Sequence, residues 1–315
     1  MIRVIPIETG KARIKTAQIT GQHGRSGVGR KIDIFRDTHW VDPLPILSFL
    51  IEHPDGKFIV DTGDTWRNSV PGYLPWWNPF FKQVQIKVAP LEEIGSRLDA
   101  MDIDPARDVA AVILTHFHHD HTGGLDHFPH NRIIAPRESY QASVGLKGKM
   151  MGCLPQRWPI WFKPDLIVPE TSDNGPFPLV HPITKDRRIF MVPTPGHSEG
   201  HMSVVVRGED VTYFLAGDAT YSQSARGKSG RRNQRSRALD RHIARHQGVR
   251  GKGADHHFAG ARSGWSHPTC EALSPRLKVR WGHLRDGQLV DSIDSTRKLS
   301  SSALRGSTRG ASTAS

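Results

Sequence analysis

Residues 109–124 of this 315-residue chain read VAAVILTHFHHDHTGG. The apolar run 109–114 leads directly into a turn that carries ligand-type side chains at the spacing His-x-His-x-Asp-His. Such a run predicts a buried strand, and a buried strand makes a rigid platform for the residues at its end. Imidazole nitrogen and carboxylate oxygen are ligands that zinc takes in catalytic sites, so the stretch predicts a metal site.

The spacing inside the turn divides these side chains between two ions. His116 and His118 are two residues apart and can face the same way in an extended turn. Asp120 and His121 then fall on the far side of the turn and can serve a second ion. His119 is expected to point to solvent or to support the site from behind. A single histidine is usually an ordinary residue, but four ligand-type side chains within six positions at a strand end favour metal binding.

Three other apolar runs end in similar side chains. Residues 189–192 lead into a Pro-Gly turn with His197 at its tip, and residues 211–216 lead to Gly217 and Asp218. Each motif alone is common in turns, but strand ends that repeatedly present His or Asp predict one shared site. Upstream, Asp61 follows the apolar residues 58–60. It either orients a ligating histidine from behind or is a simple turn aspartate.

Together these motifs resemble the metallo-β-lactamase superfamily of hydrolases, and most of all its N-acyl-homoserine lactonase branch. The resemblance covers about residues 5–223 and includes the run Pro-Arg-Glu-Ser-Tyr at 136–140. It implies an α/β protein, an αββα sandwich with the site at one edge of two sheets. It also implies two metal ions, usually Zn²⁺. The residues implied as ligands are His116, His118 and His197 for the first ion, Asp120 and His121 for the second, and Asp218 for both.

The resemblance further implies the chemistry of ester-bond hydrolysis. A water shared by two ions becomes a hydroxide near neutral pH and attacks an ester-type carbonyl. Tyr221, three residues after Asp218, is implied as a stabiliser of the oxyanion, although it could be an ordinary packed tyrosine. Asp120 is placed to relay a proton to the leaving oxygen. Neither Cys153 nor Cys270 lies in a catalytic signature, and no Gly-x-Ser-x-Gly elbow occurs.

The substrate is expected to be a small acyl lactone or ester, most simply an N-acyl-homoserine lactone. Aromatic residues are frequent in segments 66–82 and 158–162, which either line an apolar groove for an acyl chain or anchor loops. A thioesterase of the glyoxalase II type is a second enzymatic interpretation. A catalytically impaired metal-binding remnant is an interpretation of a different class. Acyl-chain preference, native metal and oligomeric state are not encoded in any motif.

Charge separates the chain into two parts. The net charge is +12, but residues 222–315 hold 19 of the 43 Lys and Arg and 6 of the 31 Asp and Glu, so they carry +13 and the rest −1. We therefore expect a hydrolase domain at 1–225 and a basic, poorly patterned, disordered tail at 226–315. The near-neutral body argues against nucleic acid as its partner. Helix signals occur at 89–100 and 105–108.

The expected cellular compartment is inferred from the lack of membrane-span and signal-peptide patterns in the sequence. No run is long and apolar enough for a membrane span, and the first residues lack the apolar core of a signal peptide. Two cysteines give no disulfide framework, so a cytoplasmic location and no membrane partner are expected.

One ligand that the resemblance implies is missing from the tail. A further histidine for the second ion is expected in a Pro-x-His-Asp-Pro turn a few dozen residues after Asp218, and no such turn occurs in frame. Read one base later, the codons for residues 254–265 permit a peptide such as TTILPAHDP. We therefore hypothesise a frameshift shortly after Gln223, with weaker binding of the second ion and reduced hydrolysis in this chain. The alternative is a genuine basic arm that binds nucleic acid, which salt-dependent DNA binding lost on deleting the tail would reveal.

Overall fold

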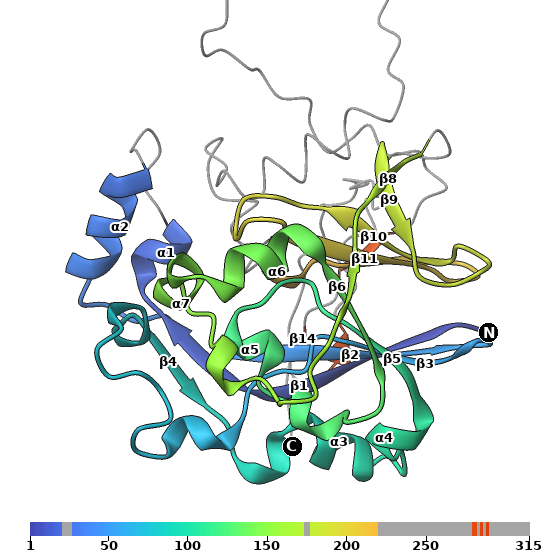
Figure 1. Cartoon of the computed structure of the whole chain (residues 1–315), viewed down its shortest axis with the longest axis horizontal. Helices are drawn as coiled ribbons and strands as arrows, with labels where there is room; N and C mark the ends of the chain where they lie inside the picture. Colours follow the sequence, from blue (N-terminus) through green and yellow to red (C-terminus); the bar gives the residue numbers. More distant parts are fainter. Residues whose placement is uncertain (21–26, 173–176, 220–278, 282–283, 286–287, 290–315) are drawn as a thin grey trace, which may run out of the picture.

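A computed structural model describes residues 1–20, 27–172 and 177–219, with short segments at 279–281, 284–285 and 288–289. Two main sheets face each other, as Figure 1 shows. The strands of the first sheet, in spatial order, are β4 (Val84–Lys87), β1 (Arg3–Ile14), β2 (Leu44–His53), β3 (Gly56–Val60), β5 (Val109–Ile113), β6 (Arg132–Pro136) and β7 (Asp165–Ile167). Those of the second are β13 (Val279–Trp281), β12 (Thr212–Leu215), β11 (Met202–Arg207), β10 (Ile189–Pro193), β9 (Leu179–Pro182) and β8 (Glu170–Thr171).

Short helices and one small hairpin complete the described part. The α-helices are α1 (Thr16–Thr20), α2 (Gly27–Arg36), α3 (Ile94–Asp99), α4 (Pro105–Asp108), α5 (His119–Thr122), α6 (Arg137–Val144) and α7 (Leu146–Met150). The 3-10 turns are η1 (Trp66–Ser69), η2 (Pro79–Lys82), η3 (Pro90–Glu92), η4 (Leu125–His127), η5 (Pro155–Arg157) and η6 (Gly217–Ala219). The hairpin pairs β14 (Leu284–Arg285) with β15 (Gln288–Leu289). Among the described helices, none has the length and apolar character needed to cross a bilayer.

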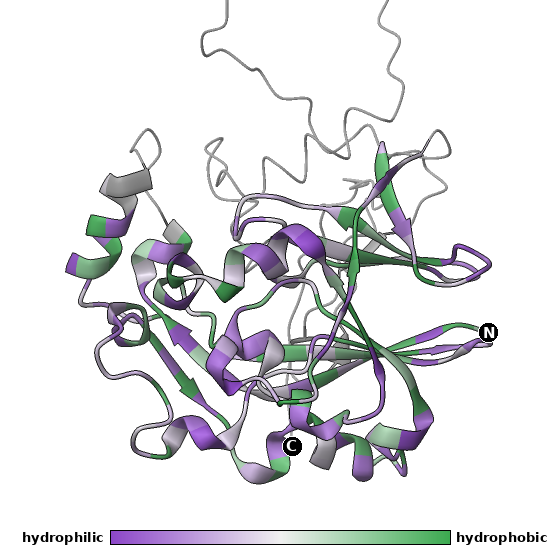
Figure 2. Cartoon of the chain, in the orientation of Figure 1, coloured by the Kyte–Doolittle hydropathy of each residue, from purple (hydrophilic) through white to green (hydrophobic). Residues whose placement is uncertain are grey.

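The core lies between the two sheets. One buried cluster there joins side chains of β2, β3, β5 and β6 to side chains of β10, β11 and β12, and includes Ile113, Met191 and Val204. Hydrophobic residues accordingly concentrate on the central strands (Figure 2). Apolar side chains on both sheets are removed from water together, which is the main force that holds sheet against sheet.

Helices cover the other face of the first sheet. Ile94 and Leu98 of α3 and Tyr140 of α6 pack with β5 residues such as Val112 in a second cluster. A third cluster, on the outer face of the second sheet, is built from Phe177, Phe190, Val192, Val205 and Phe214, and no residue of a described helix belongs to it. The expected α/β class with two stacked sheets is confirmed.

The predicted domain boundary and the frameshift hypothesis concern residues that lie almost entirely outside the described part. Within 226–315 the structure describes only β13, β14 and β15. β13 runs parallel to β12, with Val279 opposite Thr212 and Trp281 opposite Phe214. Tyr221 also lies outside the described residues.

Candidate metal centre

Strand directions bring distant residues to one edge. β3, β5 and β6 are parallel, so Asp61 after β3 and His116 after β5 leave the first sheet on the same side. β10 and β12 both pair antiparallel with β11, so His197 and Asp218 leave the second sheet on one side as well. A backbone hydrogen bond of 3.1 Å from Met202 N–H to Thr115 C=O joins these two edges.

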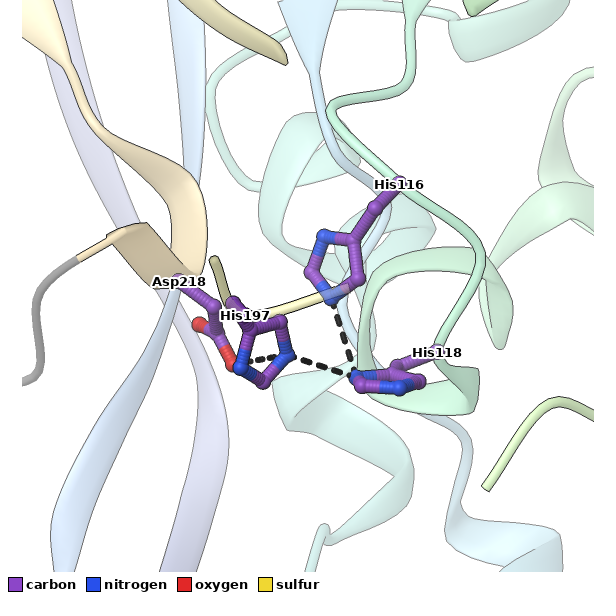
Figure 3. A group of neighbouring side chains, drawn as sticks. All are labelled: His116, His118, His197 and Asp218. Atoms are coloured by element: carbon purple, nitrogen blue, oxygen red, sulfur yellow. Dashed lines mark hydrogen bonds and ion pairs between the residues drawn. The ribbon is translucent and has the colours of Figure 1, made fainter. Parts of the chain in front are cut away.

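Four side chains converge there in a first group, drawn in Figure 3. His116 Nε2 lies 3.1 Å from His118 Nδ1, and His197 Nε2 lies 2.8 Å from the same atom. Asp218 Oδ2 approaches His197 Nε2 at 3.2 Å. One ligand atom from each of these residues lies within 4.8 Å of all the others.

A second group lies beside the first and shares Asp218. His121 Nε2 is 3.4 Å from Asp218 Oδ1 and 3.8 Å from Asp120 Oδ2. Asp218 therefore directs Oδ2 to the first group and Oδ1 to the second. All six residues predicted as metal ligands thus meet, and they fall into the two sets that the resemblance implies.

Asp61 supports both groups from behind. Its Oδ1 accepts the Thr115 backbone N–H at 2.8 Å, and its Oδ2 lies 2.8 Å from both Thr115 Oγ1 and His121 Nδ1. If Nδ1–H of His121 donates to this carboxylate, Nε2 keeps its lone pair for the site. Thr115 Oγ1 also lies 3.0 Å from His116 Nδ1, which orients that ring in the same way. The contact with a ligand-type histidine expected for Asp61 is present, and Asp61 adopts φ +57° to make it.

His119 does not point to solvent; its side chain is buried. Its Nδ1 lies 2.8 Å from Asp64 Oδ2, within ion-pair distance. Its ring meets the Phe81 ring edge-on at 5.0 Å between centroids. The expectation that His119 faces solvent is therefore wrong, and a supporting role for it stays a prediction. Gly123 allows this packing, because a Cβ there would lie 2.7 Å from the Asp64 Cα.

The pKa shifts of the buried groups differ from one side chain to the next. Burial lowers the pKa of His116 well below its usual value, and the neighbouring histidines lower it further. Burial also disfavours charge on His121, but Asp61, Asp120 and Asp218 outweigh it and raise the pKa of that imidazole. Burial opposes ionisation of Asp218 too, yet His197 and His121 hold its pKa far below the usual range. Burial raises the pKa of Asp120.

These donors fit divalent zinc. Two atoms bound tetrahedrally to one zinc at its usual Zn–N distance of about 2.0–2.1 Å lie about 3.3 Å apart. The separations of 2.8, 3.1 and 3.2 Å in the first group are close to this value. In the first group, the lowered pKa values of His116 and Asp218 favour the neutral imidazole and the ionised carboxylate, which are the forms that bind a metal.

The aromatic segments serve partly as anchors. Trp158 and Phe162 pack in the cluster that contains Phe117, at 5.2 and 6.4 Å between ring centroids. Phe80 lies against His118, with 5.9 Å between centroids. By contrast, Trp76 is 85% exposed. The anchoring interpretation therefore holds for 158 and 162, and an exposed apolar surface remains in segment 66–82.

Sequence reasoning missed three supporting residues. Thr115, Asp64 and His201 are buried beside the two groups, and each contacts a ligand-type residue or its neighbour. Thr115 and Asp64 adjoin motifs that the sequence already singled out, at one residue before His116 and three after Asp61. His201 follows His197 by four residues, and only the paired strands show that it turns back toward Asp218.

Comparison with known proteins identifies a family and several similar enzymes. Residues 41–247 match the family model of the metallo-beta-lactamase superfamily. The N-acyl homoserine lactonase AttM of Azorhizobium caulinodans is 28% identical over 195 residues, 57% of this chain and 66% of that protein. The N-acyl homoserine lactonase AiiA of Bacillus thuringiensis subsp. kurstaki is 27% identical over 186 residues, with the same coverage of both chains. This chain thus spans slightly under two thirds of these relatives.

A solved structure shares the fold. It is an N-acyl homoserine lactone hydrolase with its product N-hexanoyl-L-homoserine bound at the catalytic metal center. Its TM-score is 0.56 at 20% sequence identity, with 77% of this chain and 86% of that chain covered. This likeness concerns the fold alone, whereas the family match extends over residues 41–247, more than half of the sequence, and shows that the chain belongs to the metallo-beta-lactamase superfamily.

Proposed function

We propose that this protein is a metal-dependent hydrolase that opens the ring of an N-acyl-homoserine lactone or a closely similar lactone. The observation that carries the proposal is the position of Asp218, whose two carboxylate oxygens face two separate groups of ligand-type side chains. A carboxylate placed in this way is suited to bridging two ions. We assign zinc because imidazole and carboxylate are its usual ligands in catalytic sites.

The proposed roles follow from the positions of the side chains. Two zinc ions held by these residues would polarise the lactone carbonyl and lower the pKa of a water shared between them. His116, His118 and His197 would hold one ion, Asp120 and His121 would hold the other, and the Asp218 carboxylate would serve both. The Asp120 side chain is 24% exposed, so it can reach substrate and hand a proton to the leaving oxygen. Tyr221 stays a prediction, as the stabiliser of the oxyanion.

The lactone assignment is supported by the relatives. AttM and AiiA are both N-acyl homoserine lactonases by name, at 27–28% identity. The candidate surface for an acyl chain is the loop that carries the exposed Trp76 and Trp77, because this loop leads to Phe80, whose ring contacts His118. Apolar side chains beside a few convergent polar groups are typical of small-molecule sites.

The decisive experiment measures ring opening by zinc-loaded protein. Short- and long-chain N-acyl-homoserine lactones are assayed beside a thioester control, in wild-type protein and in His116→Ala. The exposed His130 provides a matched control, His130→Ala, because its side chain lies outside both groups. We expect lactone hydrolysis that His116→Ala abolishes and His130→Ala leaves unchanged.

Other outcomes identify the alternatives. Faster hydrolysis of the thioester would contradict the lactone assignment and favour the glyoxalase II-type interpretation. Bound metal with no activity on either substrate would favour a catalytically impaired remnant.

A further inference from the structure

We infer that His201 is a positioning residue that fixes the bridging carboxylate, and that it is itself barred from binding metal. This inference rests on the proposed function, because it concerns how Asp218 is held for two ions. His201 belongs to the loop between β10 and β11 and lies just before β11. It is 1% exposed, and its ring lies 4.9 Å from the His116 ring and 6.0 Å from the His197 ring, between centroids.

A directional chain of hydrogen bonds runs through this ring. The Asp218 backbone N–H donates to His201 Nε2 at 3.2 Å. Because Nε2 accepts, the ring proton sits on Nδ1 and donates to Thr194 Oγ1 at 2.8 Å. The Thr194 hydroxyl then donates to Ser203 Oγ at 2.8 Å, and the Ser203 hydroxyl donates to the Ala216 carbonyl at 3.1 Å.

This series of hydrogen bonds begins and ends on the same backbone turn. It starts at the N–H of Asp218 and finishes at the C=O of Ala216, so it holds the turn from both sides. Thr194 and Ser203 are almost fully buried like His201, so no water competes for these bonds at the network's centre. Between the two anchored residues, Gly217 adopts φ +51° and packs so closely that a Cβ would lie 3.0 Å from His201 Nε2.

The same bonds exclude His201 as a metal ligand. An imidazole binds metal through a nitrogen lone pair, and only Nε2 has one in this tautomer. That lone pair already accepts the Asp218 N–H. The short separation of His201 from His116 and His197 therefore reflects support of the site, whereas Asp120, His121 and Asp218 supply the second group.

Binding of an ion in the second group should depend most on the hydrogen bonds that hold Asp218. In the described part of the chain, its group has three members, and Asp218 is one of them, while the first group keeps three histidines without it. Loss of a residue that orients a metal ligand typically costs 10–100-fold in metal affinity. We expect that loss mainly at the second site when the chain of hydrogen bonds is broken.

The test compares His201→Leu, Thr194→Val and Thr194→Ser with wild type. Co²⁺ is titrated against a competing chelator, and its visible absorption reports each ion separately. His201→Leu should weaken the second ion by about 10–100-fold. Thr194→Val removes the hydroxyl with little change of shape and should act in the same direction, whereas Thr194→Ser keeps the hydroxyl and should restore wild-type binding. Ile51→Val, a core change on β2 at a side chain that makes none of these hydrogen bonds, controls for lost stability.

A second measurement needs no metal. In ¹⁵N-labelled, metal-free protein, the His201 ring should be neutral with its proton on Nδ1, and the Asp218 amide should exchange slowly in wild type and Thr194→Ser but faster in Thr194→Val. A proton on Nε2, or equal amide exchange in both Thr194 variants, overturns the inference. Unchanged affinity for the second ion in Thr194→Val also overturns it, even if His201→Leu fails to fold. Wild-type protein that binds no Co²⁺ contradicts the proposed function instead, while the ring proton and amide exchange still decide the role of His201.

Discussion

Asp61→Asn tests whether one buried carboxylate sets the orientation of the ligand histidines. Asparagine has nearly the shape of aspartate and tolerates the observed φ of +57°, so the backbone is not strained by the change. Its Oδ1 can still accept the Thr115 N–H. Its NH₂ group, however, replaces the Oδ2 that faces Thr115 Oγ1 and His121 Nδ1.

The expected loss of metal affinity follows from this exchange of an acceptor for a donor. An NH₂ group can donate to His121 Nδ1 only if the ring proton moves to Nε2, the atom that faces Asp120 and Asp218. The second ion must then displace that proton. We expect the loss of this orienting contact to weaken the second ion about 10–100-fold, or about 1.4–2.8 kcal/mol. If the tautomer does not change, two buried donors face each other, and unfolding becomes easier by about 1–3 kcal/mol.

The assay measures affinity for both ions by chelator competition, together with thermal unfolding of metal-free protein. Asp126→Asn is the matched control, because Asp126 forms an exposed ion pair with Arg67 at 2.6 Å. That pair should contribute at most about 1 kcal/mol to stability and nothing to metal binding. The reasoning is refuted if Asp61→Asn retains both wild-type metal affinity and wild-type stability.

Three further predictions concern the surrounding structure. Gly217→Ala places a Cβ 2.8 Å from Thr115 Oγ1 on a residue with φ +51°. The change should lower the free energy of unfolding of metal-free protein by more than about 1 kcal/mol, and wild-type stability would contradict the close packing of this turn. Burial opposes ionisation of Glu93, but hydrogen bonds from His127, Thr65 and Trp66 outweigh it and lower the pKa of this carboxyl. The stability that Glu93 contributes is therefore present above its unfolded-state pKa and is lost as the pH falls through its folded-state pKa. Glu93→Gln should flatten the acid side of the curve of stability against pH, and an unchanged slope would contradict this. The buried His53 ring, in the β2–β3 hairpin, lies 2.9 Å from Asp186 in the turn between β9 and β10 of the second sheet. His53→Ala should therefore lower the free energy of unfolding, measured in urea, by about 1–3 kcal/mol, and an unchanged value would contradict a stabilising role for this contact.

The parts of the fold that sequence predicts are those fixed locally. The apolar run before His116 is a strand, and helix signals at 105–108 coincide with α4, where the Asp104 side chain accepts the N–H groups of Ala106 and Arg107. The spacing of the His-x-His-x-Asp-His turn indicates which side chains face which group, because two residues of extended backbone return a side chain to the same face.

Residues whose role depends on pairing between distant strands escape such reasoning. His119 has a polar ring in a polar motif, but it is buried against Asp64 and Phe81, which come from other segments. His201 and Thr194 flank the loop of His197, and only the β10–β11 register places their side chains together. No local pattern encodes contacts of this kind, since each depends on where another segment lies.

The hypothesis of a frameshift after Gln223 is decided by the coding DNA. If it is correct, the codons for residues 254–265 spell a Pro-x-His-Asp-Pro turn when read one base later. Codons that cannot spell His-Asp in that frame end the hypothesis.

The central claim is that His116, His118, His197 and Asp218 hold one ion while Asp120, His121 and Asp218 hold another. The most direct test is a crystal structure of zinc-loaded protein with anomalous scattering measured on both sides of the zinc absorption edge. We predict a strong zinc peak within the first group and a weaker one within the second, with Asp218 in contact with both. Zinc-saturated crystals without a peak between these histidines would contradict the account.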